Sequence, residues 1–238
     1  MKKMKALLFI AAMAWASSTV NAQNGFYLSP SVGIGATNVK QNYTYNDPTG
    51  NSITRSSLIN YNAKIGIGYK YKNWRIQTGL QYLQTGYELN NLLFSSDFDP
   101  AQPVTTGTGT YQIRYKHLGI PLQVGYVIQP QKKFSLVPFV GLLTTYNIDA
   151  KSNIEMGNAI TNTSWSRKDF DNRYNRMSVW GTAALYGQFN LNNNISLFAG
   201  PSMQYMISNF DKSPGIGSHT SRQRNYSINI DFGINIGL

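Results

Sequence analysis

The sequence predicts an all-β protein: a closed antiparallel transmembrane β-barrel of about eight strands in an up-and-down meander. Three features predict it: period-two alternation of apolar and polar residues, alternating short and long connections, and an N-terminal export segment. The strongest alternation spans residues 57–72, where Ile59, Tyr61, Ala63, Ile65, Ile67, Tyr69 and Tyr71 are separated by polar residues or Gly. A tilted membrane-spanning strand needs about 9–11 residues, whereas strands of soluble proteins cluster near 5–6. The length of this stretch therefore favours a membrane barrel over a soluble sandwich.

The same alternation occupies residues 225–238, and weaker versions predict strands at 26–36, 74–82, 111–126, 134–146, 177–191 and 195–207. Along 111–126 the apolar phase slips, because Ile113 and Tyr115 stand at odd positions but Ile120 and Leu122 at even ones. If all of these side chains face lipid, one extra residue restores the register. A β-bulge is therefore predicted between residues 116 and 118.

Connection lengths predict the orientation. Short connections follow Lys72, Ile128 and Leu191, whereas long polar ones follow Ala36, Tyr87, Asn147 and Ser208. Outer-membrane barrels have tight periplasmic turns and long extracellular loops, so both termini are expected on the periplasmic side. Aromatic residues are expected in belts at the two interfaces: Trp74, Tyr69, Tyr71 and Phe134 near the periplasm, and Tyr82, Tyr87, Tyr111 and Tyr146 near the outside.

The first residues predict export. Lys2, Lys3 and Lys5 precede a short apolar run, and Val20-Asn21-Ala22 ends in the small residue that a signal peptidase prefers. We expect a cleaved signal peptide at residues 1–22, a barrel domain at 23–238, and a location in the outer membrane of a Gram-negative bacterium. The chain has no Cys, which excludes a Cys-linked lipid anchor, disulfides and thiolate metal sites.

Charge limits the partners. Removing residues 1–22 takes three Lys and no acid from a chain of net charge +11, which leaves +8. In an exported protein with scattered bases, nucleic acid is not the expected partner, whereas outer-membrane lipid and glycolipid phosphates are. Long loops could also bind a protein partner.

Three segments resemble the PorT-like outer-membrane β-barrel proteins of the Bacteroidota. These are the strand Tyr115-Lys-His-Leu-Gly-Ile-Pro-Leu-Gln-Val-Gly-Tyr126, the segment Pro138-Phe-Val-Gly141, and the alternating final hairpin. The resemblance covers the mature chain and implies a barrel fold and an outer-membrane location. It does not imply an activity, because members of the family have varied roles.

Catalytic and metal sites are not expected. The two histidines, His117 and His219, have no carboxylate at a persuasive strand spacing, so neither suggests a Ser-His-acid site or another nucleophilic centre. Two histidines without Cys and with scattered acids also form no recognisable metal-ligand pattern. No cofactor is predicted.

The predicted lumen is basic and filled, since eight strands leave just enough width for side chains. Inward positions are expected to hold Lys64, Lys70, Arg75, Arg114 and Lys116, with Gln77, Gln81, Gln112 and a single acid, Asp231. An unpaired buried charge is costly, so Asp231 is expected to pair with Lys64, Arg75 or Arg114. An anion-selective pore is the functional alternative to this plug.

A second set of bases, in or near the last two long loops, could hold glycolipid phosphates or could be ordinary solvated charge: Arg167, Lys168, Arg173, Arg176, Arg222 and Arg224. The leading interpretation is a non-enzymatic barrel that acts through extracellular loops in surface interaction, adhesion or envelope integrity. The alternatives are a narrow porin or secretion-system barrel, and a lipid-modifying enzyme that uses His117 or His219.

Overall fold

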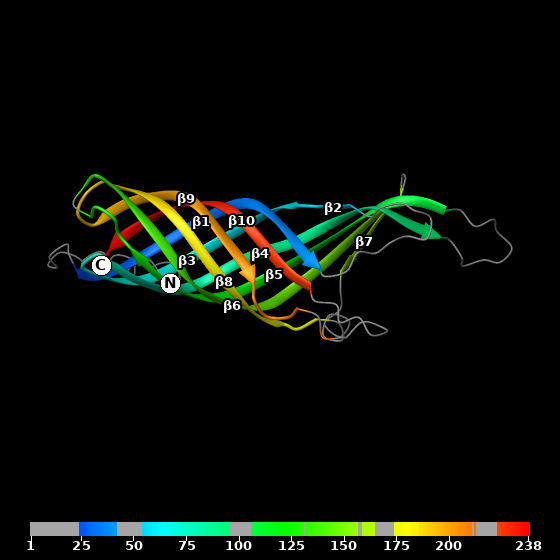
Figure 1. Cartoon of the computed structure of the whole chain (residues 1–238), viewed down its shortest axis with the longest axis horizontal. Coiled ribbons are helices and arrows are strands. Elements are labelled where there is room, and N and C mark those ends of the chain that lie inside the picture. The colour runs from blue at the N-terminus through cyan, green and yellow to red at the C-terminus, as the bar shows by residue number, and fades with distance from the viewer. Residues whose placement is uncertain are drawn as a thin grey trace, which may run out of the picture.

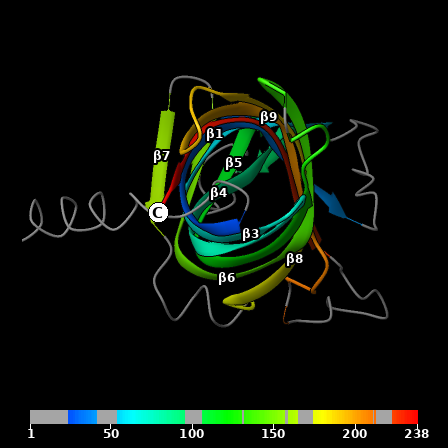
Figure 2. The same cartoon turned by 90° about the vertical axis from the view of Figure 1, so that its left-hand side faces the viewer.

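The structure is a computed structural model, described for residues 24–41, 54–95, 106–130, 132–156, 159–164, 174–210, 212 and 223–238. Its strands are β1 (Asn24–Gln41), β2 (Thr54–Ser56), β3 (Leu58–Tyr71), β4 (Trp74–Ser95), β5 (Thr106–Tyr126), β6 (Phe134–Met156), β7 (Ala159–Ser164), β8 (Met177–Asn190), β9 (Ile195–Met206) and β10 (Gln223–Gly237). Strands β1, β3, β4, β5, β6, β8, β9 and β10 pair in chain order, and β1 pairs with β10. Figure 2 looks into this closed ring. The predicted eight-stranded antiparallel meander is confirmed.

The two short strands lie outside the ring: β2 pairs with β4 beyond the end of β3, and β7 pairs with β6. We call one end of the barrel the turn end: β1, β4, β6 and β9 begin there, and β3, β5, β8 and β10 end there. The opposite end is the loop end. There β4, β5 and β6 extend beyond the other strands, together with β7 (Figure 1).

The outer face of the ring is apolar and the inner face is polar. Along β3 the side chains alternate strictly between buried and exposed: Lys64 is 6% exposed but Ile65 is 67% exposed. Buried polar side chains and exposed large apolar ones recur on every strand of the ring. This is the reverse of a soluble protein, and it is the arrangement of a barrel with lipid outside and a polar interior.

Within the described segments, no helix is both long and apolar enough to cross a membrane.

A register irregularity lies at Lys116/His117, within the predicted range, but the extra residue is not on β5. Inward burial continues without a break at odd positions of β5, through Ile113, Tyr115, His117 and Gln123. What changes is the polarity of the two faces: toward the loop end the inward residues become apolar and the outward residues become polar. On β4 the buried residue Leu83, which pairs with His117, is likewise an apolar inward side chain at this level of the barrel. The apolar phase slips because lipid gives way to water outside the barrel.

The register irregularity lies on the neighbouring strand. Lys116 pairs with Asp149 and His117 pairs with Asn147, so Ile148 of β6 is the extra residue. A second irregularity lies on β4 between Leu89 and Leu92, where Asn91 has a φ of 62°. Both bulges occur near the loop end, where the strands leave the regular ring.

The aromatic belt at the turn end is as predicted. Trp74, Tyr69, Tyr71 and Phe134 are all exposed on the outer face. Trp74 packs edge-on against Tyr126 with ring centroids 5.1 Å apart, and Phe26 packs against Tyr69 at 5.0 Å. At the other interface Tyr146 is exposed, but the prediction is wrong for Tyr87 and Tyr111, which pack into the interior.

Candidate functional site

The lumen is the candidate site, and its middle section is a network of buried polar side chains. Asp231 lies at the centre of it. The amide Nδ2 of Asn62 donates to Asp231 Oδ1 over 3.0 Å, and the Tyr186 hydroxyl donates to Oδ2 over 2.8 Å. The carboxylate therefore has two hydrogen-bond donors from opposite sides of the barrel, because Asn62 belongs to β3 and Tyr186 to β8.

A second chain of contacts crosses the same section. The Lys64 ammonium donates to Gln123 Oε1 over 3.2 Å, and Gln123 Nε2 donates to the Thr182 hydroxyl over 3.2 Å. Lys64 also interacts with Asp231 electrostatically, at a distance beyond that of an ion pair. The network thus joins β3, β5, β8 and β10 through side chains alone.

Inward glycines show how tightly this section is filled. A Cβ on Gly33 would collide with Asp231 Oδ1 and Asn62 Nδ2, and one on Gly66 would collide with Gln77 Nε2. Toward the turn end, the rings of Phe139 and Phe198 lie over Gly125 and Gly233 in the same way. Side chains from neighbouring strands therefore occupy the space that these glycines leave.

The loop end of the lumen is closed by an apolar cluster that we call the apolar cap. Its buried members are Val39, Leu83, Tyr87, Ile113, Tyr115, Leu143, Ala150, Trp180, Met206 and Phe210. Trp180 is fully buried and its indole nitrogen donates to the Thr145 hydroxyl over 2.9 Å. Phe210 packs edge-on against Tyr115, with ring centroids 4.9 Å apart.

Two members of this region come from outside the strands of the ring. Phe210 follows β9, and Tyr174, which stacks on it at 4.9 Å, precedes β8. The Asn175 amide donates to the Phe210 carbonyl over 2.8 Å, which joins the two segments. Sequence reasoning missed these residues because it treated the connections as polar loops. The available signal was an isolated Phe at position 210 within a polar stretch.

His117 is buried next to the apolar cap. It is 0% exposed, its Nε2 lies 3.1 Å from the Thr85 hydroxyl, and its ring packs against Trp180 with centroids 5.8 Å apart. No carboxylate of the described residues pairs with it. His219 lies outside the described residues. Within the described part of the chain there is no group of three or more His, Cys, Asp or Glu that could hold a metal ion.

Three residues predicted to be inward face outward instead. Arg114, Lys116 and Gln112 stand at even positions of β5, whereas the buried positions there are odd. Lys116 forms an ion pair with Asp149 at 2.9 Å, and Gln112 donates to Glu88 over 2.5 Å. The prediction failed because it assumed that polar faces are always inward, which holds only where lipid lies outside.

Asp231 does not form the predicted ion pair. Lys64, Arg75 and Asp231 all lie inside the barrel, but Lys116–Asp149 is the one ion pair within 4.0 Å that the described residues contain. Hydrogen bonds from Asn62 and Tyr186 to the Asp231 carboxylate take the place of an ion pair. Arg75 is separate from this network and lies over the ring of Tyr27, 5.3 Å from its centroid.

Of the six bases predicted for glycolipid binding, Arg176 and Arg224 are described. Arg176 donates to the Tyr146 hydroxyl over 2.7 Å and lies over its ring. Arg224 pairs in register with Lys40 at the end of β1. The two arginines belong to opposite sides of β9, so the structure does not bring them together. Arg167, Lys168, Arg173 and Arg222 lie outside the described residues.

A closed ring of eight strands with an apolar exterior and a polar lumen defines an integral β-barrel of the membrane. Residues 21–186 match the model of the outer membrane protein beta-barrel domain, and the chain belongs to that family. It is therefore an outer-membrane protein. No curated protein matches the chain.

Solved structures with a similar chain course include other barrels. Neisserial surface protein A is 13% identical, with 90% of this chain and 97% of that chain covered and a TM-score of 0.46. The attachment invasion locus protein Ail of Yersinia pestis, solved with a heparin analogue, is 14% identical, with coverage of 89% and 99% and a TM-score of 0.36. The outer membrane protein OprG of Pseudomonas aeruginosa is 11% identical, with coverage of 90% and 97% and a TM-score of 0.42.

Replacing Asp231 by Asn is expected to lower the free energy of unfolding by about 1–3 kcal/mol, because the amide is uncharged and has one acceptor oxygen for the two buried donors, Asn62 and Tyr186. Lys64 also loses a compensating charge. The measurement is the urea concentration at which the purified protein loses its heat-resistant, fast gel mobility. The matched control is Asp149→Asn, which removes a partly exposed ion pair and is expected to cost about 1 kcal/mol or less. Equal midpoints for the two variants would contradict a central role for Asp231.

Proposed function

We propose that this protein is a non-enzymatic outer-membrane barrel that acts through the surface it presents beyond the membrane at the loop end. The observation that carries the proposal is a filled lumen combined with an extended sheet. β4, β5 and β6 contain 22, 21 and 23 residues, about twice what a bilayer requires. The residues of these strands that extend past the ring form a sheet with β7 beyond it (Figure 1).

Basic side chains at the loop end, on this sheet and on β1 and β10, suit contact with soluble proteins or with lipid head groups. Arg114, Lys116 and Lys151 face outward near the loop end, and Lys40 and Arg224 lie side by side across β1 and β10. Charge-assisted hydrogen bonds from such bases suit glycolipid phosphates. We include outer-membrane glycolipid and a protein partner, but no nucleic acid, in the proposal.

The proposed topology places the turn end in the periplasm and the loop end outside the cell. The tight turns at one end and the long connections at the other support it. A signal peptide at residues 1–22, cleaved before a barrel domain at 23–238, completes the proposal. The resemblance to PorT-like proteins of the Bacteroidota stands as a further proposal within the family.

The interior favours this function over the two alternatives. A porin needs an open path, whereas the apolar cap and the polar section place buried side chains across the lumen at two levels. A lipid-modifying enzyme would need a base that meets substrate, whereas His117 is enclosed by Trp180 and Phe210.

In planar bilayers, the purified protein is expected to carry negligible steady current, because both levels of the lumen are occupied. A double variant, Trp180→Ala with Phe210→Ala, weakens the cap but keeps the polar section, and it is expected to remain closed as well. Single-channel recording checks both. A steady, resolvable conductance of the unaltered protein would contradict the proposal and favour a narrow pore.

Photo-crosslinking in native membranes tests whether the protein binds its partners through the surface at the loop end. A crosslinking amino acid at Lys151, outward on β6 at the loop end, is expected to yield defined adducts with protein or glycolipid. The matched control is the same replacement at Lys72, an exposed lysine in the turn between β3 and β4, which is expected to yield none of these adducts. Adducts at position 72 and none at position 151 would reverse the proposed surface.

A further inference from the structure

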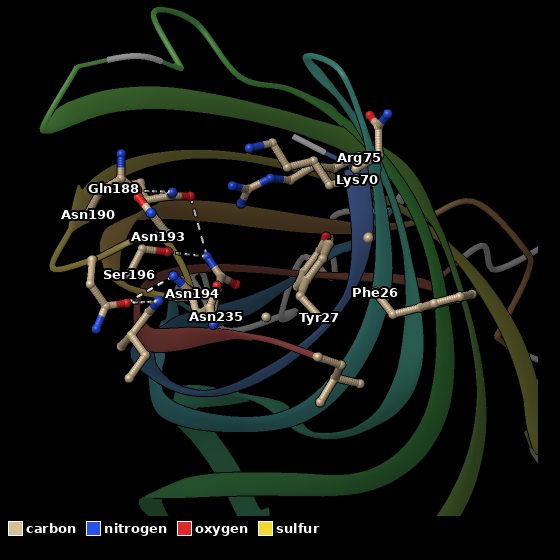
Figure 3. Close-up of a pocket in the computed structure, with 16 residues that line it drawn as sticks. Phe26, Tyr27, Lys70, Arg75, Gln188, Asn190, Asn193, Asn194, Ser196 and Asn235 are labelled. Atoms are coloured by element: carbon tan, nitrogen blue, oxygen red, sulfur yellow. Dashed lines mark hydrogen bonds between the residues drawn. The ribbon is translucent and has the colours of Figure 1, made fainter. Parts of the chain in front are cut away.

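The turn end of the lumen contains a pocket of about 100 Å³ that the filled sections leave open. Figure 3 shows Lys70 and Arg75 extending side by side from one wall toward Gln188 and Asn190 on the other. The two cations belong to adjacent strands, because Lys70 of β3 pairs in register with Arg75 of β4. Like charges directly opposite each other destabilise a sheet.

The burial of Arg75 and the missing hydrogen bond of its Nε are the observations that favour a bound ligand. Its side chain is 6% exposed, and its Nε is buried without a hydrogen-bond partner. No Asp or Glu side chain of the described residues lies within 4.0 Å of its guanidinium, which lies over the Tyr27 ring, 5.3 Å from the ring centroid. A buried charge without a counter-charge is strongly unfavourable. The pocket beside Arg75 can admit a counter-charge.

The rest of the lining offers polar groups and no acidic side chain. The opposite wall is an ordered row of amides: Asn235 Nδ2 donates to Gln188 Oε1 over 3.4 Å, and Gln188 Nε2 donates to Asn190 Oδ1 over 2.6 Å. The buried Tyr27 hydroxyl has no partner and can donate to a ligand. None of the side chains that line the pocket is Asp or Glu.

We propose that this pocket binds a phosphate group. A phosphate monoester carries about −1.5 to −2 at neutral pH, and two basic side chains, Lys70 and Arg75, line the pocket. The planar guanidinium of Arg75 suits two phosphate oxygens at once, and the Lys70 ammonium acts as a point charge beside it. Sites for drug-sized ligands span about 300–1,000 Å³, so this pocket suits the phosphate group alone and not a nucleotide.

The phosphate can come from solution or from the head group of a lipid, since the pocket opens at the turn end, where the aromatic belt marks the membrane surface. This inference is independent of the function proposed for the loop end. The two surfaces lie at opposite ends of the barrel (Figure 1).

The test is titration of inorganic phosphate into the full-length protein in a phosphate-free maltoside detergent, with chloride at equal ionic strength as the blank. Calorimetry and the temperature at which heat-resistant gel mobility is lost are both recorded. We expect saturable binding and a rise in that temperature, because a ligand that binds only the folded state stabilises it. Arg75→Gln is expected to weaken binding at least about tenfold. The control Arg114→Gln, at an outward position of β5, is expected to bind as the unaltered protein does.

Two further variants keep the test decisive. Lys70→Gln is expected to weaken binding while leaving Arg75 in place, and it carries the test if Arg75→Gln does not fold. Arg75→Lys keeps the charge but loses the planar fork, so it is expected to bind more weakly than the unaltered protein. A merely structural role for Arg75 predicts that Arg75→Gln unfolds earlier and that phosphate stabilises no variant.

A second arm identifies the source of the phosphate. Short-chain phosphatidic acid, added to the same samples, competes with inorganic phosphate if a lipid head group is the ligand, and it does so at lower concentration than phosphate itself. A weaker or equal effect identifies phosphate from solution. Absence of saturable binding in both arms, or equal binding by the unaltered protein and Arg75→Gln, overturns the proposal.

Discussion

The pairing of β1 with β10 is the interaction on which the structure depends. It runs from Tyr27 opposite Gly237 to Gln41 opposite Gln223 and joins the two ends of the described chain. Lipid offers no partners for backbone N–H and C=O groups, so a sheet can remain in a membrane only if its edges are closed on each other. Closure after eight strands also fixes the width of the lumen. At that width side chains fill the interior, and the polar section and the apolar cap follow from it.

What fills the interior depends on what surrounds the barrel. Where lipid lies outside, the outward side chains are apolar and the inward ones include Asn62, Lys64 and Asp231. Nearer the loop end the outward residues of β5 are polar, and the inward ones are Ile113 and Tyr115. Near the loop end this part of the barrel thus resembles a soluble protein, with apolar side chains inside. On β5 the boundary between the two patterns marks the edge of the membrane.

This boundary explains how far sequence reasoning succeeded. The eight strands, their order and the turn-end belt follow from period-two alternation, and β3 and β10 could be predicted almost residue by residue. The same reasoning failed for Arg114 and Lys116, since it applied one rule of polarity to the whole length of β5. The partners of Asp231 could not be predicted, because Asn62 and Tyr186 are brought to it by barrel closure and strand stagger, which no local pattern encodes. The environment of Arg75 is likewise a product of the closed ring.

The central claim is that the polarity of the two faces of β5 reverses at the membrane edge, while its side chains continue to alternate between inward and outward. The chain has no cysteine, so single cysteines can be placed along β5 without altering the rest. A spin label at positions 114, 116, 118, 120 and 122 reports the contact of each outward site with lipid-soluble oxygen and with a water-soluble nickel chelate. The account predicts chelate access at 114 and 116 and oxygen access at 118, 120 and 122. Burial at 114 and 116, with exposure at 113 and 115, would contradict it and would restore a bulge on β5.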